Sequence, residues 1–527
     1  MVAGVVREMG EKSKALFGLW KGRYLLIFIG GILLYLSFST HFLANPDSIW
    51  NGMFYKAGYD GENSLGRWGL GLLAGLKGYT ISPAAVTIFS IFLLSIICMF
   101  VCRLLNLESE ILIIITGIFL LASPNIVNTL TYYYCADFYI FAYLLNVLAI
   151  YFAHRHRGFV SWVLPMLAIA ISLAIYQSYI SVAIVLSILL MVSMLFDARI
   201  ENKEIIKRAT KLICIGGGGV TCYLILTKGQ ESIGLLNLSE DRGFSRMGYI
   251  DIAQLPQQIV RCYKEFINYF FRNVFINNDW MNRKYWNLFL VLVIILTMLI
   301  LFFQNRKVFN ITRILLLLLA VVLLPIGCYC MLITASEVSL YSSTGILLIP
   351  AVNYVYVLWI MLASRINGSR WMHLVFGKYI VLVGSMALGM ILVCFVLVFQ
   401  ACMQNNLIKT YAVASDIVQE MDELTGGSEE HAFMVSGDVD LGQGELYNIV
   451  KGTVAGYGMT WSDINGRNAC WKSILGFYFG REYEVCSSEV CQELMKSDAF
   501  LNMPEYPNSG YTAIIDGYVV VKLGENG

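Results

Sequence analysis

Long apolar stretches recur along the chain, separated by short polar connections. One of them, "YIVLVGSMALGMILVCFVLVF" at 379–399, has no charged residue. Because a helix rises 1.5 Å per residue, roughly 20 residues cross the hydrocarbon core of a bilayer. The pattern predicts eleven spans, with two of them turning at Gln177, at 24–45, 81–102, 111–132, 138–153, 159–176, 178–196, 212–227, 286–303, 314–334, 344–363 and 379–400.

The composition agrees with this pattern. The chain is 58% hydrophobic and 14% charged, whereas soluble domains carry roughly 25% charged residues. We therefore expect an all-α polytopic membrane protein. Most of the thirteen cysteines lie in the apolar stretches, where they pack as small apolar residues. Cys486 and Cys491 lie outside them, and a disulfide between these two is one interpretation.

Charge is divided unevenly along the chain. Residues 401–527 hold 7 Lys and Arg against 18 Asp and Glu, which leaves 30 against 18 for the remainder. Basic residues in the short connections all fall on one side of the predicted bundle, at the amino terminus, 154–157, 197–211, 304–307 and 364–370. Cytoplasmic loops carry such an excess. The opposite, outer side then receives loops 46–80, 133–137 and 228–285, together with the tail.

Three regions follow from these patterns. Residues 1–23 are expected to form a cytoplasmic amphipathic segment with no cleavable signal peptide, and residues 24–400 a membrane domain. Residues 401–527 are expected to form a small extracytoplasmic α/β domain. Within it, helical spacing runs to the pair Gly426-Gly427, and Asp516-Gly517 stands between two β-branched strands as a hairpin turn.

Acids gather in the first outer loop. Asp47 follows the first span and has aromatic residues near it in the sequence. One interpretation is a partly desolvated carboxylate that acts as general base. The other is an ordinary acid that caps the next helix. Asp60 and Glu62 suit a base or metal pair, or are solvated loop acids. Arg67 in "SLGRW" either clamps a lipid phosphate in a bidentate way or anchors to headgroups.

Further polar residues are expected at the same outer side. Asp137 lies in a short turn among tyrosines, where an acid near membrane depth is a functional-site candidate or a cap for the next helix. The other candidates for substrate contact are Gln177, Tyr179, Glu337, Arg242 and Arg246. The amide of Gln177 and the phenol of Tyr179 could bind a sugar or satisfy backbone groups. Glu337 is an acid at the outer edge, and Arg242 and Arg246 are cations of the long loop.

The deep parts of the predicted spans carry almost no ionisable residue. A proton- or ion-coupled transporter needs charges near the midplane of the bilayer. A reaction at the outer leaflet does not need them. The distribution therefore favours chemistry at the outer mouth of the bundle.

Several segments together resemble the bacterial polytopic glucosyltransferases of the Gtr serotype-converting type, within the GT-C superfamily. They are "NPDSIWNGMFYKAGY", "SLGRWGLGLL", "SPAAVTIFSIFLLSI", "YYYCADFYIFAYLLNVLAIY" and "ISLAIYQSYISVAIVLSILL". The resemblance extends to about residue 360. It implies a GT-C-like bundle in a bacterial plasma membrane, and a donor sugar, glucose, carried on polyprenyl phosphate. The implied acceptor is a cell-surface polysaccharide or a teichoic-acid-like wall polymer, and no nucleic-acid partner is expected.

The resemblance also implies an inverting displacement in which an acid of the first outer loop is the base. Asp47 is the leading candidate, and Asp60 and Glu62 follow. Cations such as Arg67 would stabilise the leaving phosphate, and Asp137 would assist the base or position the acceptor. A metal is not required, although the Asp60-x-Glu62 pattern could hold a divalent ion.

Three other functions are open at this point. A polysaccharide polymerase, or a transferase of another sugar, would use the same scaffold with different chemistry. A lipid-linked oligosaccharide flippase or transporter would line a central cavity with charge. A membrane anchor with an acidic outer domain would lose nothing when Asp47 or Asp137 is replaced.

Overall fold

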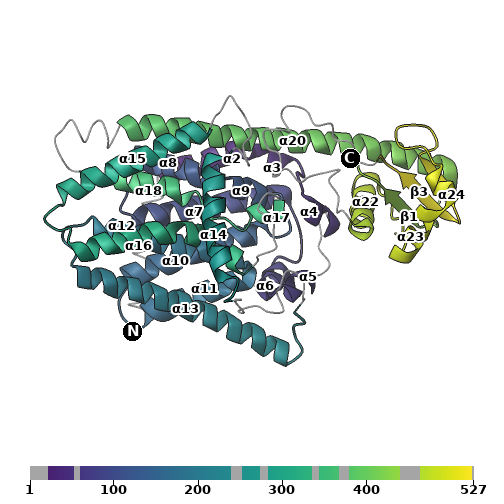
Figure 1. Ribbon diagram of the computed structural model, residues 1–527. Helices are drawn as coiled ribbons and strands as arrows, with labels where there is room; N and C mark the ends of the chain where they lie inside the picture. The colour runs from purple at the N-terminus through teal and green to yellow at the C-terminus, as the bar shows by residue number, and fades with distance from the viewer. Residues whose placement is uncertain are drawn as a thin grey trace.

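Most of the chain folds into apolar helices that lie alongside one another in a bundle, from which one long helix runs to a small α/β unit (Figure 1). The structure is a computed structural model, and it describes residues 22–52, 60–238, 252–272, 283–334, 343–366, 379–439 and 463–524. The predicted amphipathic segment at 1–23 lies almost entirely outside the described residues.

Within the described residues, seven helical segments are long and apolar enough to cross a membrane. They are α7 (Pro83–Leu104), α10 (Ala136–Arg155), η1 with α12 (Gln177–Leu195), α13 (Asn202–Ser232), α15 (Arg283–Gln304), α16 (Ile311–Cys328) and α20 (Ile380–Thr425). Four apolar helices are shorter: α2 (Arg23–Leu34), α8 (Glu110–Leu121), α11 (Val160–Ile175) and α18 (Tyr354–Ala363). The prediction of a helical membrane protein is confirmed, and the count of eleven spans stays a prediction.

Shorter helices fill the connections. They are α3 (Leu36–Thr40), α4 (Pro46–Trp50), α5 (Asp60–Ser64), α6 (Trp68–Leu76), α9 (Pro124–Thr129), η1 (Gln177–Tyr179), η4 (Cys330–Ile333) and α17 (Ser343–Ile346). The predicted turn at Gln177 is this η1, between α11 and α12 (Ile180–Leu195). Helix α14 (Leu255–Phe271) runs steeply across the long helices and packs against α15, α16 and η4 (Figure 1).

Helix α20 does not end near residue 401, where the sequence predicts the boundary between the membrane domain and the C-terminal domain. It continues without a break through that position to Thr425, where Gly426 ends it in the left-handed conformation with φ of 64°. Its 46 residues span roughly 69 Å at 1.5 Å per residue, more than twice the hydrocarbon thickness. The helix therefore joins the bundle to the α/β unit as one continuous rod (Figure 1).

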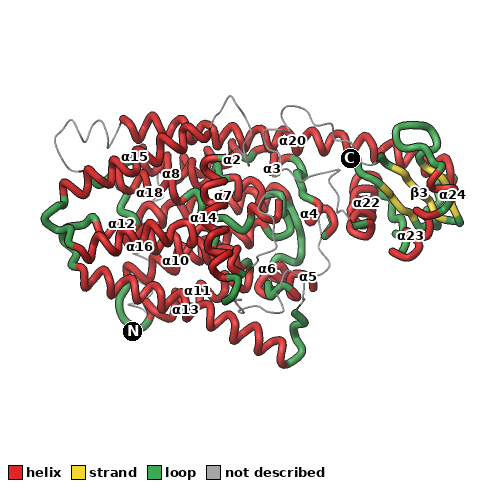
Figure 2. Tube along the Cα trace, in the orientation of Figure 1, coloured by secondary structure: helices red, strands yellow, loops and turns green. Residues whose placement is uncertain are grey.

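The C-terminal unit, which we define as β1 (Phe433–Ser436) with residues 463–524, has a three-stranded sheet (Figure 2). Strand β3 (Tyr518–Lys522) lies between β1, which is parallel to it, and β2 (Thr512–Ile515), which is antiparallel. Asp516 and Gly517 join β2 to β3 with φ of 50° and 84°, as a two-residue hairpin turn requires. Helices α22 (Ile464–Phe479), α23 (Ser488–Lys496) and α24 (Asp498–Leu501) complete the unit.

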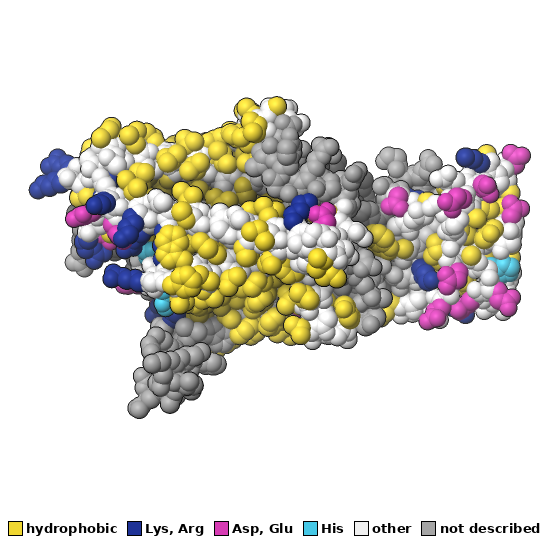
Figure 3. All heavy atoms as spheres, turned by 90° about the horizontal axis from the view of Figure 1, so that it is seen from below, with side chains coloured by type: hydrophobic (Ala, Val, Ile, Leu, Met, Phe, Trp, Pro, Cys, Tyr) yellow, Lys and Arg dark blue, Asp and Glu magenta, His cyan; other side chains and the backbone are white. Residues whose placement is uncertain are grey.

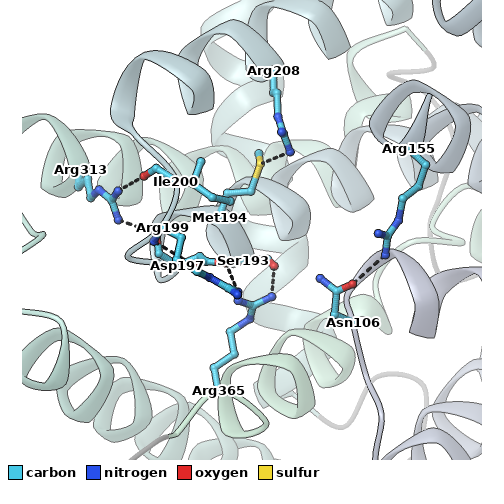
Figure 4. Close-up of polar contacts among 10 residues, drawn as sticks. All are labelled: Asn106, Arg155, Ser193, Met194, Asp197, Arg199, Ile200, Arg208, Arg313 and Arg365. Carbon is cyan, nitrogen blue, oxygen red and sulfur yellow. Dashed lines mark hydrogen bonds and ion pairs between the residues drawn. The ribbon is translucent and has the colours of Figure 1, made fainter. Parts of the chain in front are cut away.

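Charged side chains are segregated at the two ends of the molecule. Lys and Arg gather at the end of the bundle far from the C-terminal unit, and many Asp and Glu side chains lie on the surface of that unit (Figure 3). At the first of these ends, which we call the arginine end, five arginines from separate helices and connections lie in one region: Arg155, Arg199, Arg208, Arg313 and Arg365 (Figure 4). The predicted gathering of the basic connections on one side therefore holds for Arg155, Arg199, Arg208 and Arg365, while Arg313 of α16 was not part of that prediction.

The cysteines are free thiols in the structure. Cys486 and Cys491, for which a disulfide was one interpretation, are both buried in the C-terminal unit. The pair is therefore not cross-linked here.

Candidate functional site

Asp47 stands in the first turn of α4, a short helix that is firmly attached to the bundle. Asn45 caps this helix, since its side-chain oxygen accepts a hydrogen bond from the Ser48 N–H at 2.9 Å, and Pro46 occupies the first turn. The Ser48 hydroxyl donates to the Thr131 carbonyl at 2.8 Å. The capping role that was open for Asp47 thus belongs to Asn45, and half-buried Asp47 is held beside the segment that leads into α10.

Glu62 lies on α5 with 7% of its surface exposed. This acid and Asp47 both influence the buried phenol of Tyr134. Burial, then the neighbouring Cys135 thiol and the charges of Glu62 and Asp47, raise the pKa of Tyr134 above its usual range. Acids from two separate helices of the first loop therefore act on one phenol.

Arg67 stands just before α6, beside Tyr139 of α10 and Tyr176, which lies between α11 and η1. Its Nη1 donates to the Tyr139 hydroxyl at 3.4 Å, and its Cζ lies 4.7 Å from the centre of the Tyr176 ring. The Tyr139 and Tyr176 rings are stacked with their centres 4.2 Å apart. A guanidinium over an aromatic face is favoured electrostatically. Glu62 is close enough to act on this cation through its charge.

Neutral side chains hold the backbone directly before Arg67. The Gln177 amide donates to the Leu65 carbonyl at 3.0 Å and to the Tyr223 oxygen at 3.1 Å. The Tyr223 hydroxyl in turn donates to the Gly66 carbonyl at 2.9 Å. Gln177 thus satisfies backbone groups, the second of its two interpretations. Tyr223 was not predicted from the sequence, because a tyrosine inside an apolar span gives no signal of its own.

Tyr179 points into the bundle and lies 1% exposed. Its ring stacks on that of Tyr143 with centres 5.4 Å apart, and Tyr143 donates a hydrogen bond to the Tyr354 hydroxyl at 2.9 Å. A phenol in this position packs α10, η1 and α18 together. The ring of Tyr179 thus stacks on Tyr143, whereas the ring that lies under the Arg67 guanidinium is that of Tyr176.

Asp137 forms an ion pair with Lys77, with 2.8 Å between Oδ2 and Nζ. Their side chains are 6% and 24% exposed, and the Lys77 Nζ also lies 4.9 Å from the centre of the Phe138 ring. Asp137 stands in the first turn of α10, where the helix dipole favours an anion. The pair joins the end of α6 to the start of α10. Lys77 was missed, although a single lysine after "WGLGLLAGL" was a visible signal.

The remaining predicted residues cannot be placed within this site. Asp60 begins α5, but its side chain lies outside the described residues, as do Glu337, Arg242 and Arg246. In the described part of the chain, no group of three or more His, Cys, Asp or Glu side chains is arranged to hold a metal ion.

The C-terminal unit lies against the helix that carries Asp47. Helix α22 packs on α4, and the Cys470 thiol donates to the Pro46 carbonyl at 3.6 Å (Figure 1). We call the region formed by α4, α5 and Arg67, with Tyr134, Tyr139 and Tyr176, the acid end. It lies at the end of the bundle opposite the arginine end, and next to the C-terminal unit.

One comparison with known proteins gave a match. A family model described as glucosyl transferase GtrII matches residues 36–363, more than half of the chain. The match extends from α3 to α18 and contains the acid end, and the C-terminal unit lies beyond it. The comparisons with curated proteins and with solved structures gave no match.

Proposed function

The chain belongs to the GtrII family of glucosyl transferases, and on that premise we propose that it moves a hexose, glucose, from a polyprenyl-phosphate carrier to a cell-surface polysaccharide or wall polymer. The donor is a lipid, so the reaction takes place where the bundle meets the membrane surface. The observation that carries this proposal is that Asp47, Glu62 and Arg67 all lie on or beside α4, α5 and the start of α6, at one end of an apolar bundle (Figure 1).

Asp47 is the general base in this proposal. It takes the proton from an acceptor hydroxyl while that oxygen attacks the anomeric carbon. The bond between the anomeric carbon and the phosphate oxygen breaks at the same time, and the polyprenyl phosphate leaves with the electron pair. One displacement inverts the anomeric configuration. The half-burial of Asp47 supports this role, because an acceptor must reach the carboxylate.

Arg67 stabilises the negative charge that develops on the leaving phosphate. A planar guanidinium suits a phosphate because it donates two parallel hydrogen bonds. Its contacts with Tyr139 and Tyr176, and the nearby charge of Glu62, support a fixed orientation. Glu62 is then the partner that orients Arg67, and Asp60 is the second candidate base. A divalent metal ion is not part of this scheme.

The other predicted residues have supporting roles. Gln177 positions the loop that precedes Arg67, and Asp137 holds Lys77 between α6 and α10. Glu337, Arg242 and Arg246 stay candidates for contacts with donor or acceptor. The C-terminal unit recognises the acceptor, which its packing on α4 supports.

We place the arginine end on the cytoplasmic side of a bacterial plasma membrane, because cytoplasmic connections carry the excess of Lys and Arg. The acid end and the C-terminal unit then face outward, where surface polymers are assembled. The amino terminus lies inside.

The test uses purified protein in detergent with polyprenyl-phosphate glucose that is labelled in the sugar, and surface polysaccharide extracted from a host that lacks the protein. We expect the label to move to the polysaccharide with inverted anomeric configuration, and UDP-glucose to give no transfer in the same mixture. Label that stays on the lipid, or transfer from UDP-glucose alone, would contradict the proposal. Movement of the lipid across a vesicle membrane without transfer would favour a flippase.

A further inference from the structure

Three long helices of the bundle enclose an apolar groove that the proposed mechanism does not use. Helix α12 packs against α13 on one side and α16 on the other, and the hollow between them has a volume of about 480 Å³. This lies within the range of roughly 300–1,000 Å³ that is typical of ligand sites. Its buried floor comes from α11, α12, α13 and α16, with Ile169, Ala183, Leu212 and Ala320.

The lining is suited to hydrocarbon. The described residues that line it include no charged side chain, and the hydroxyl of Ser187 is satisfied by the Ala183 carbonyl at 2.7 Å. The rim is exposed at Ile213 and Leu319, 73% and 50% respectively. The groove therefore opens sideways between α13 and α16. The face of the bundle where α13 lies is covered with hydrophobic side chains (Figure 3).

Two consecutive glycines of α13 keep the groove open. A Cβ added at Gly216 or Gly217 would meet no atom within 4 Å. Gly219 on the same helix is different, because a Cβ there would lie 2.7 Å from Ile169 of α11. Gly219 thus serves close helix packing, whereas the missing side chains of Gly216 and Gly217 leave empty space beside α12.

One end of the groove lies next to the acid end. Ile180 lines it and directly follows η1, and Val220 lines it one helical turn before Tyr223, which holds the loop of Arg67. The other end lies at Ala209 and Leu316, toward the arginine end. From Val220 to Ala209 the groove follows α13 for roughly 17 Å at 1.5 Å per residue. It therefore runs from the site into the hydrocarbon region.

We propose that this groove holds the isoprenoid tail of the lipid-linked donor, with the phosphate directed toward Arg67. The inference rests on the proposed function, because a lipid-linked donor needs a place for its tail beside the reacting phosphate. The groove reaches η1 and the turn of α13 before Tyr223, close to Arg67. This position favours the tail of the donor over a phospholipid, which could bind anywhere on the bundle surface. Binding the tail there fixes the anomeric carbon relative to Asp47, as orientation of a substrate requires.

The test compares Gly217→Leu with Gly30→Leu. Gly30 of α2 is also exposed and has no atom within 4 Å of an added Cβ, so it is a matched control at a lipid-facing position outside the groove. Each variant is assayed with an undecaprenyl-phosphate glucose donor and with a short prenyl analogue that does not reach Gly217. Thermal unfolding in detergent checks that both variants fold.

For the long donor we expect the KM of Gly217→Leu to rise about 10-fold or more, because the new side chain occupies the space of the tail. The KM for the short analogue should stay unchanged, as should both values for Gly30→Leu. Equal kinetics of the two variants with the long donor would overturn the groove assignment. Absence of transfer by the wild type with either donor would instead overturn the proposed function.

A second measurement does not depend on catalysis. A photoreactive prenyl phosphate should label peptides of α12, α13 or α16 in the wild type. Unlabelled undecaprenyl phosphate should suppress this labelling, and phosphatidylglycerol at the same concentration should not. Equal suppression by the two lipids would identify an ordinary phospholipid site and overturn the proposal. This readout also covers the case in which Gly217→Leu fails to fold.

Discussion

The two ends of the bundle both gather charged side chains, but they use them differently. At the arginine end, Arg313 donates to the carbonyls of Asp197 and Ile200 (Figure 4) and to that of Leu195. Arg155 donates to the carbonyl of Arg103. Cations there hold the main chain of the connections in place.

At the acid end, neutral side chains hold the main chain instead. Asn45 and Ser48 attach α4, and Gln177 and Tyr223 attach the loop before Arg67. Asp47 and Glu62 act on Tyr134. Arg67 contacts Tyr139 and Tyr176. A scaffold made of neutral hydrogen bonds lets the charged groups serve a substrate. The difference suggests that charge has a structural purpose at one end and a chemical one at the other.

The largest effect should follow from replacing the proposed base. Asp47→Asn keeps the size of the side chain and removes its basicity, so the rate of transfer should fall by about 10²- to 10⁴-fold. The measurement is initial velocity of labelled glucose transfer. Asp197→Asn, at the arginine end, is the matched control and should keep the wild-type rate. Comparable activity of the two variants would remove Asp47 from its role and leave Asp60 or Glu62 as the base.

Replacing the proposed phosphate-stabilising cation should have the next largest effect. Arg67→Lys keeps the charge but loses the planar group that lies over Tyr176, so kcat should fall by about 10²-fold. The same change at Arg155 should leave kcat unaffected. Steady-state kinetics of both variants check this. A lysine that supports full activity at position 67 would show that a phosphate is not recognised there in a bidentate way.

A stability effect is expected at the arginine end. Arg313 is 2% exposed, and Arg313→Met leaves three carbonyl groups without their donor. The free energy of unfolding should fall by about 3–5 kcal/mol. The rate of transfer per folded molecule should stay near that of the wild type. Denaturation in detergent, measured alongside activity, separates the two quantities. A loss of rate without a loss of stability would contradict the structural role of this end.

A smaller effect is expected for the groups that position Arg67. Tyr223→Phe removes the hydroxyl that joins Gln177 to the Gly66 carbonyl, and two hydrogen bonds are worth about 1–2 kcal/mol, or roughly 10-fold in kcat. Tyr263→Phe removes a hydroxyl that bonds the Val322 carbonyl away from the site and should leave kcat unchanged. If kcat falls equally in both variants, the effect is a general loss of packing.

The smallest effect concerns pH. A hydrogen bond from Arg199 lowers the pKa of Asp197, so folding favours the ionised carboxylate. This contribution is complete above the ordinary pKa of an aspartate and is lost as pH falls through the lowered pKa. Because Arg199 is 89% exposed, solvent screening keeps this contribution small. The loss of stability between pH 7 and pH 3, measured by thermal unfolding, should therefore be slightly smaller for Arg199→Ala than for the wild type. An equal or larger loss would contradict this.

Hydropathy and turn chemistry were enough to predict much of the fold. The apolar stretches, the turn at Gln177 and the hairpin at Asp516-Gly517 all have local causes, and each appears in the structure. The predicted domain boundary at residue 401 does not coincide with the end of a helix, because the hydropathy of the chain changes there and α20 continues. No glycine or proline interrupts residues 401–425, so one helix continues through both environments.

Much less of the site could be predicted. The sequence marks Asp137 as an unusual acid but does not reveal Lys77, its partner 60 positions away. Tyr223 lies 157 positions from Gly66, and no local pattern connects them. Such contacts depend on how helices pack, so residue type and spacing indicated where polar groups gather, but not which of them hold the scaffold.

The central claim is that transfer takes place at the acid end, on the side of the membrane that carries the C-terminal unit. Proteoliposomes loaded with labelled polyprenyl-phosphate glucose test it directly, when the orientation of the protein is determined by protease cleavage of the C-terminal unit in a separate sample. Polysaccharide, which does not cross the bilayer, is supplied from outside. We expect label on the polysaccharide in vesicles whose C-terminal unit faces outward. Product formed instead in vesicles whose C-terminal unit faces the lumen would contradict it.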